Sequence, residues 1–141
     1  MQYSTSNILT VADCDKLITF ATKDKSLLEA KRIYLLKALD KLTEGVDAIP
    51  QSFESVNIEV AALGQAVDQM PEGDLKTNLA LYMKRREYQQ LSLSTKVDDY
   101  TIIALIEKQY DVSKVESEIQ ASAVYLAALE ARKAELGAAE Q

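Results

Sequence analysis

The 141-residue sequence contains no histidine and no tryptophan, and only one cysteine. Histidine is the most common general base and the most common transition-metal ligand, so its absence removes two frequent routes to catalysis. The Glu-x-x-His pairs of di-iron bundles and the His-Glu-x-x-His motif of zinc proteases cannot be written from these residues. One cysteine without histidine also excludes a structural zinc site. We therefore expect no catalytic residues and no metal.

Glycine and proline are scarce too, at four and two residues. The glycines are scattered, so the chain has no glycine-rich phosphate-binding loop, and we expect no cofactor. The single thiol, Cys14, cannot form an intramolecular disulfide, and its place among apolar residues predicts a small buried side chain. No apolar run approaches the roughly 18 residues of a membrane span, and the N-terminus lacks a signal-peptide pattern. We expect a cytoplasmic protein that does not bind membranes.

What the sequence does have is helical periodicity. Apolar or small residues recur at alternating three- and four-residue steps from Val11 to Ile49, from Phe53 to Met70 and from Leu105 to Leu136. This spacing is typical of helices that pack along a coiled-coil-type seam. It predicts an all-α fold, an elongated antiparallel bundle of three to five helices in a single domain of residues 1–141. No motif in the sequence identifies a protein family.

Local signals place the ends of the helices. We expect them at about 10–46, 52–70, 74–91 and 97–136, with frayed ends at 1–9 and 137–141. Thr10 and Asp13 have the spacing of a capping box at the start of the first helix. Gly45 and Pro50 favour its end, because glycine weakens a helix and the residue before proline avoids helical geometry. The segment 70–74, with Pro, Gly and a capping Asp74, predicts a tight reversal and an antiparallel hairpin.

Two further breaks in the helices are open to alternatives. Near Lys25 the first helix is either interrupted or continues with the alkyl stems of Lys25 and Arg32 along the seam, and we favour the interruption. Near Thr95 the sequence is poor in helix formers and offers another capping spacing. The rival there is one unbroken helix from Leu75 to Leu136, about 90 Å long, and we favour the break.

The net charge of −6 is unevenly distributed. Residues 1–48 carry seven acids and seven bases, whereas residues 49–74 carry five acids and no base. Residues 75–97 reverse this with five bases and one acid, and residues 98–141 return to nine acids and four bases. A basic helix between acidic ones is best explained by complementarity inside a folded bundle. The overall charge disfavours nucleic acid as a partner.

The strongest candidate for a recognition patch lies in the basic segment and consists of Tyr82, Lys84, Arg85, Arg86 and Tyr88. Guanidinium groups and tyrosines suit phosphates, carboxylates and stacked bases. Three cations cannot form the broad positive stripe of a nucleic-acid binder, and the acids of 49–74 lie in the expected partner helix. We therefore favour an internal salt-bridge role for these cations.

Three cations, Lys25, Arg32 and Arg86, fall on seam positions and could specify helix register or a partner. The leading functional interpretation is a non-enzymatic helical interaction or structural module that contacts a protein partner or a second copy of itself. The alternative is a bundle that binds a small anionic ligand, or acts on one, through the region of Tyr82, Arg85, Arg86 and Tyr88. A nucleic-acid accessory protein is the third interpretation.

Overall fold

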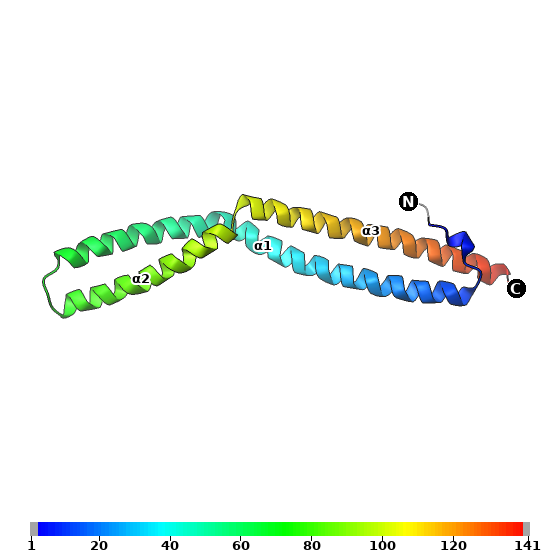
Figure 1. The fold of residues 1–141 in the computed structure, drawn as a ribbon, viewed down its shortest axis with the longest axis horizontal. Helices are drawn as coiled ribbons and strands as arrows, with labels where there is room; N and C mark the ends of the chain where they lie inside the picture. Colours follow the sequence, from blue (N-terminus) through cyan, green and yellow to red (C-terminus); the bar gives the residue numbers. More distant parts are fainter. Residues whose placement is uncertain (1–2, 140–141) are drawn as a thin grey trace. The chain divides into compact units, whose positions relative to one another are not determined.

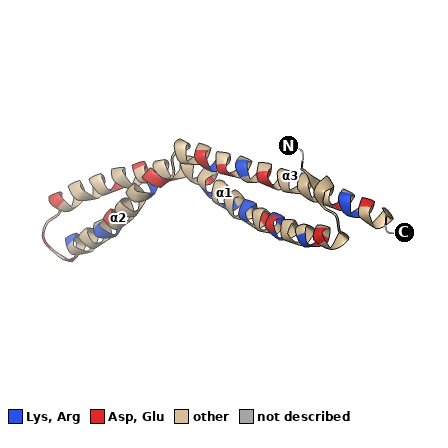
Figure 2. Ribbon diagram, turned by 45° about the vertical axis from the view of Figure 1, so that its right-hand side comes forward, with Lys and Arg blue, Asp and Glu red and all other residues tan. Residues whose placement is uncertain are grey.

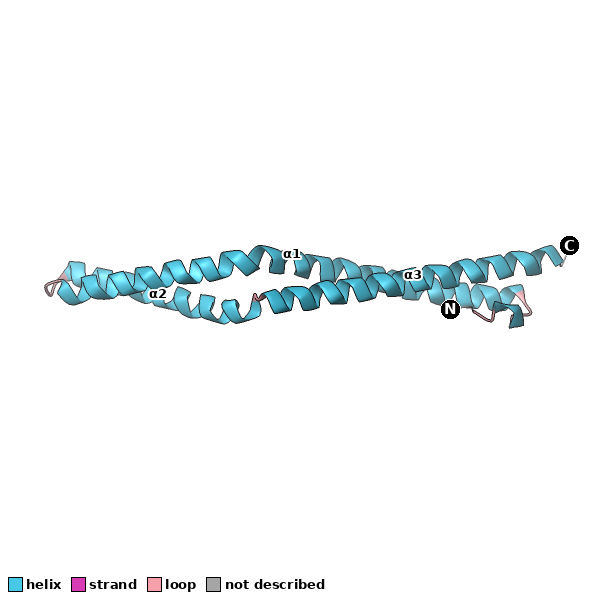
Figure 3. Ribbon diagram, turned by 90° about the horizontal axis from the view of Figure 1, so that it is seen from above, coloured by secondary structure: helices cyan, strands magenta, loops and turns pink. Residues whose placement is uncertain are grey.

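The computed structural model describes residues 3–139, and these are almost entirely helical (Figure 1). A short 3-10 helix precedes three α-helices; the elements are η1 (Thr5–Asn7), α1 (Val11–Gln69), α2 (Asp74–Asp99) and α3 (Ile102–Ala139). Within the described part of the chain there is no strand, and short loops join the helices (Figure 3). The prediction of an all-α helical bundle is confirmed.

The chain divides into two compact units, which are described separately. Unit 1 joins the described residues up to Lys37 with those from Gln109 onward, so that the first part of α1 packs antiparallel to most of α3. Unit 2 is Ala38–Lys108, in which the rest of α1 pairs with α2. The expectation of a single domain stays a prediction.

The start of α1 forms the capping arrangement that its sequence predicts. The Thr10 hydroxyl accepts a hydrogen bond from the Asp13 backbone N–H at 3.1 Å and donates one to the Asp13 carboxylate at 2.7 Å. Hydrogen bonds from Thr10 and from Lys16 lower the pKa of Asp13. The cap satisfies a backbone N–H that the first helical turn leaves without a partner.

The interruption expected near Lys25 is wrong, because α1 continues through this region. Ser26 does not cap a new helix; its hydroxyl donates to the Thr22 carbonyl one turn earlier, at 3.0 Å. Lys25 is half-buried, and its Nζ lies 3.8 Å from Glu29. The alternative that we left open, a cation whose stem follows the seam while its charge reaches solvent, is the one observed.

The helix end expected between Gly45 and Pro50 is also wrong, since α1 runs through both residues. Pro50 is exposed, and its missing N–H leaves the Val46 carbonyl without its usual helical donor. Gly45 is buried, and its missing side chain makes room for the ring of Tyr100. Apolar residues before and after Pro50 belong to one packed seam, and this packing outweighs the local signals that would end the helix.

The reversal after α1 forms the predicted hairpin between α1 and α2. Gly73 has φ 156° and ψ −176°, a conformation that is almost restricted to glycine. Gly73 is also the residue at the N-cap position of α2, where we had expected Asp74. Asp74 instead lies in the first helical turn, where its negative charge interacts favourably with the positive end of the helix dipole.

The predicted break between the last two helices exists, but it lies five residues later than expected. α2 continues past Leu91 to Asp99, and the Thr95 hydroxyl bonds back to the Leu91 carbonyl at 3.3 Å instead of capping a new helix. The cap of α3 is Thr101, whose hydroxyl accepts from the Ala104 N–H at 3.1 Å. Tyr100 precedes it, and its ring packs against Gly45.

Each unit has a small apolar core. The buried residues of unit 1 are Cys14, Ala21, Leu35, Val112, Val115 and Leu129. In unit 2 they are Gly45, Val56 and Leu93. The burial of Cys14 agrees with its prediction. α3 includes residues 137–139, which lie beyond the helix end predicted at about 136. The fraying expected at 1–9 and 137–141 stays a prediction, and residues 1–2 and 140–141 lie outside the described residues.

The two helical glycines of unit 2 allow a matched prediction. A Cβ at Gly45 would overlap the Tyr100 ring, whereas a Cβ at Gly64 would meet no atom within 4 Å. We expect Gly45→Ala to lower the free energy of unfolding by about 1–3 kcal/mol through overpacking. We expect Gly64→Ala to raise it by about 0.5–1 kcal/mol through helix propensity. Urea titrations followed by circular dichroism would measure both, and equal changes would contradict the Gly45–Tyr100 packing.

Candidate functional site

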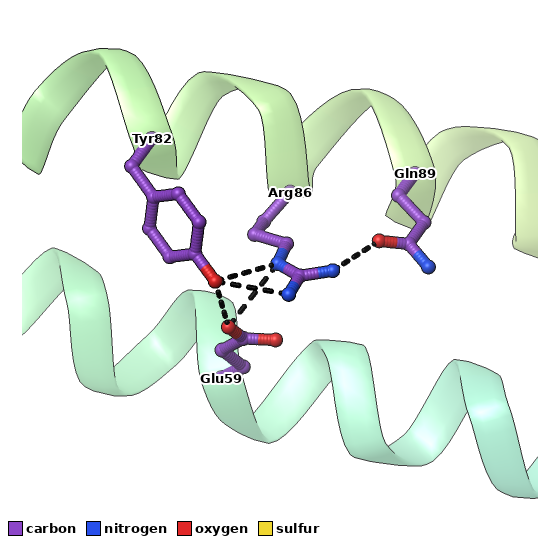
Figure 4. A network of polar contacts seen from close by, with 4 residues as sticks. All are labelled: Glu59, Tyr82, Arg86 and Gln89. Atoms are coloured by element: carbon purple, nitrogen blue, oxygen red, sulfur yellow. Dashed lines mark hydrogen bonds and ion pairs between the residues drawn. The ribbon is translucent and has the colours of Figure 1, made fainter.

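A polar network crosses between α1 and α2 in unit 2 (Figure 4). The Tyr82 hydroxyl donates to the Glu59 carboxylate at 2.9 Å, and Arg86 Nε lies 3.1 Å from the same carboxylate oxygen. Arg86 also donates to the Tyr82 hydroxyl from Nε at 3.1 Å and Nη2 at 2.9 Å, and to Gln89 from Nη1 at 2.6 Å. Every guanidinium nitrogen of Arg86 therefore faces an acceptor from the protein.

The electrostatics of this network favour a charged, fixed Arg86. The hydrogen bonds with Tyr82 and the charge of Glu59 raise the pKa of Arg86, and its guanidinium carbon lies 5.3 Å from the centre of the Tyr82 ring. The Arg86 and Glu59 side chains are 33% and 36% exposed, so water still reaches the pair. An added anion would have to compete with Glu59 for the same donors.

The predicted recognition patch is divided between two sides of α2. Tyr82 and Arg86 face α1, whereas Lys84 and Tyr88 line an open outer groove of about 270 Å³ together with Glu87 and Leu91. Residues one or two positions apart diverge around a helix, so these side chains do not converge on one ligand. Arg85 is exposed as well.

The three seam cations have different partners. Arg32 Nε lies 3.0 Å from Glu116 across unit 1, and Arg86 pairs with Glu59 across unit 2. Lys25 instead approaches Glu29, which lies on its own helix. Figure 2 shows how acids and cations are distributed along the paired helices.

Other contacts between helices were missed by the sequence analysis. Lys133 Nζ lies 2.6 Å from Asp15, and the Gln90 amide donates to Asn57 at 2.6 Å. The hydrogen bond and charge of Asp15 raise the pKa of Lys133. Lys133 continues the seam of Leu126 and Leu129 at helical spacing. A cation at a seam position could therefore have been recognised from the sequence. Asn57 and Gln90 carry no comparable signal, because their pairing depends on the relative register of two helices.

Arg132 holds the N-terminal segment against α3 within unit 1. Its guanidinium donates to the Ile8 carbonyl from Nε at 3.1 Å and from Nη2 at 2.9 Å, and to the Ser6 carbonyl at 3.3 Å. The Tyr3 ring lies 4.8 Å from that of Tyr125, measured between centroids. No residue pattern could have predicted the hydrogen bonds of Arg132, because their acceptors are backbone carbonyls.

One side of unit 1 carries an open groove of about 440 Å³, which we call the acidic groove. Small residues, Ala21, Ala121 and Ser122, leave it hollow, and the aromatic rings of Tyr3, Phe20 and Tyr125 border it.

The charges around the acidic groove have one sign. Asp24 on α1 and Glu118 on α3 are its ionisable acids, and no Lys or Arg lines it. Glu118 is half-buried, whereas Asp24 is exposed. The groove therefore combines an apolar interior with two negative charges, a combination that suits a basic amphipathic segment.

Large apolar side chains also form exposed stripes. On α1, Phe20, Leu27 and Tyr34 follow one another at seven-residue intervals and are 69%, 62% and 73% exposed. On α2, Leu81, Tyr88 and Leu91 are 54%, 76% and 66% exposed. Single exposed apolar residues are ordinary, but a repeated helical spacing places these on one face of each helix.

No candidate metal or membrane site is found among the residues that the structure describes. They contain no group of three or more Cys, Asp or Glu side chains placed to hold a metal ion. None of the helices between residues 3 and 139 combines the length and the apolar character needed to cross a membrane.

Comparison with known proteins adds no relative. No protein family, curated protein sequence or solved structure shows significant similarity to the chain. The fold alone defines the class of protein, an all-α helical bundle built from long antiparallel helices.

Proposed function

We propose that this chain is a non-enzymatic helical interaction module that acts through protein–protein contacts. The observation that carries the proposal is the pair of exposed apolar stripes at helical spacing, Phe20, Leu27 and Tyr34 on α1 and Leu81, Tyr88 and Leu91 on α2. A helical face of this kind is the usual surface for helix-mediated recognition.

The energetics of burial support this proposal. Full burial of one large apolar side chain contributes about 1.5–3 kcal/mol. Six such side chains remain mostly in water here, while each unit buries only a few residues in its own core. A partner that covered either stripe would therefore gain stabilisation that the isolated chain does not have.

The chemistry of the chain supports a binding role more than a catalytic one. The sequence has no histidine, and its one thiol, Cys14, is buried. The guanidinium of Arg86, the best candidate for an anion site, is already bonded to Glu59, Tyr82 and Gln89. These features favour the interaction module over a small anionic-ligand site.

Site-specific photocrosslinking in cells that produce the protein tests this function. A photoreactive phenylalanine analogue would replace Leu27 or Leu91, which are 62% and 66% exposed. We expect covalent adducts with another protein chain at both positions, because a bound partner would lie within reach of the stripe. The adduct can contain a second copy or a different protein, and mass spectrometry identifies which.

The matched control places the same analogue at Glu54, an exposed polar position on α1. We expect its adduct yield to be several times lower than at Leu27 and Leu91. Equal yields at the three positions would refute the proposed function, because the stripes would then be ordinary solvated surface.

A further inference from the structure

We infer that the acidic groove of unit 1 binds the outer face of α2 from a second copy of this chain. The inference rests on the proposed function and identifies its partner. We call this outer face the basic face; its residues are Leu81, Lys84, Arg85, Tyr88 and Leu91.

The first argument is the shape of the acidic groove. Its hollow arises because alanine and serine occupy Ala21, Ala121 and Ser122. Small residues on adjacent helices let a third helix approach closely and insert larger side chains between them. Phe20 would then contact the inserted side chains from one border of the groove, and the packed rings of Tyr3 and Tyr125 from the other.

The second argument is the composition of the basic face. Leu81, Tyr88 and Leu91 supply large apolar side chains that share one face of α2, because steps of three and seven residues return to the same face of a helix. All three are exposed, so this face points away from the seam with α1. Seven residues of helix correspond to about 10.5 Å. Phe20 borders the groove, and Leu27 and Tyr34 continue the exposed apolar stripe of α1 beyond it at this interval. Apolar surface next to the groove is therefore available to more than one turn of the basic face.

The third argument is electrostatic. The basic face carries Lys84 and Arg85, and Glu87, the one acid of the 75–97 segment, lines the same outer groove as Lys84. Two cations against one acid leave this surface with a net positive charge. The groove carries Asp24 and Glu118 without a cation. Contacts between opposite charges select this pairing, whereas two grooves or two basic faces would repel each other.

The choice of a second copy follows from the presence of both surfaces on one chain. A second copy offers a basic face to the groove and a groove to the basic face, so one kind of contact covers both apolar surfaces. Association between identical chains is the most frequent form of oligomer among soluble proteins.

Light scattering after size exclusion tests the inference on the purified 141-residue chain. The concentration would extend from about 1 μM to about 1 mM, a range that includes weak protein–protein affinities. We expect a molar mass above 15.6 kDa that rises with concentration and falls with added salt, because charged groups steer the contact. A monomer at every concentration would overturn the inference.

Charge reversal identifies the surfaces involved. We expect Asp24→Lys with Glu118→Lys to weaken self-association by about tenfold or more, and Lys84→Glu with Arg85→Glu to have the same effect. None of these four side chains makes an ion pair across the helices in the described structure, so helicity by circular dichroism should stay unchanged. A mixture of the two variants should regain association, because each groove then meets a face of opposite charge.

The matched control is Glu54→Lys with Asp68→Lys, which changes the net charge by the same amount at exposed positions of α1 outside the groove. We expect the control to associate like the wild type. Equal weakening in the control, or a mixture that stays monomeric, would overturn the assignment of the surfaces.

The outcomes separate this inference from the proposed function. The purified chain could be monomeric while the stripe residues still form adducts with a different protein in cells. This result would overturn the second copy as the partner but would support the proposed interaction module. Absence of stripe-dependent adducts would refute the function itself.

Discussion

Replacing Leu129 by alanine should lower the free energy of unfolding by about 2–5 kcal/mol, the range for large-to-small changes in a packed core. Leu129 is 0% exposed and is the largest fully buried side chain of unit 1. The core that surrounds it is small, so neighbouring side chains have little freedom to fill the cavity. Because whole domains are stable by only about 5–15 kcal/mol, the loss should be visible as a clear fall in the urea midpoint.

Two valines on the same helix provide the matched control for this prediction. Val115 is 2% exposed and Val124 is 58% exposed. Val115→Ala should destabilise the protein measurably, and Val124→Ala should change its stability by less than about 0.5 kcal/mol. If both valine variants lost the same stability, the inner and outer faces of α3 would be assigned wrongly.

Replacing Pro50 by alanine should raise the free energy of unfolding by about 2–3 kcal/mol. The new N–H could donate to the Val46 carbonyl, restoring the helical hydrogen bond that proline removes. Alanine also lacks the pyrrolidine ring, which inside a helix crowds the carbonyl of the preceding turn. Thermal melts monitored at the helical band would show the gain as a higher midpoint temperature.

The neighbouring variant Gln51→Ala is the control, because Gln51 is exposed on the same helix and already has an N–H. Its effect should stay within about 0.5 kcal/mol. A Pro50→Ala effect equally small would mean that the chain is not helical at this position. That result would favour the helix boundary which the local sequence predicts and the structure does not have.

The candidate site was predictable only in part. Arg32 and Arg86 were recognised because each interrupts an apolar seam, and both pair across helices. Their partners, Glu116 and Glu59, were not identified, since many acids are available and only the register between helices selects one. The acidic groove also escaped prediction, because alanine and serine on two separate helices signal nothing until those helices are placed side by side.

The sequence by itself determined the class of fold. Apolar residues recur at helical spacing over long stretches that contain few glycines and prolines. Only an α-helix places residues with this spacing on one side, where they can be buried against a neighbouring helix. It also determined the Thr10–Asp13 cap and the hairpin at Gly73, since both depend on neighbouring residues alone. These are local preferences that need no distant partner.

Only the tertiary structure decided where the long helices end. Gly45 and Pro50 favour a helix end, yet the packing of apolar residues before and after Pro50 keeps α1 helical there. The chain breaks instead at Tyr100, whose ring fills the space beside Gly45. Tertiary structure likewise decided that Tyr82 and Arg86 face α1 while Lys84 and Tyr88 face outward. The physical reason is that packing between helices adds up over many residues and exceeds the roughly 1–3 kcal/mol preference of a single glycine or proline.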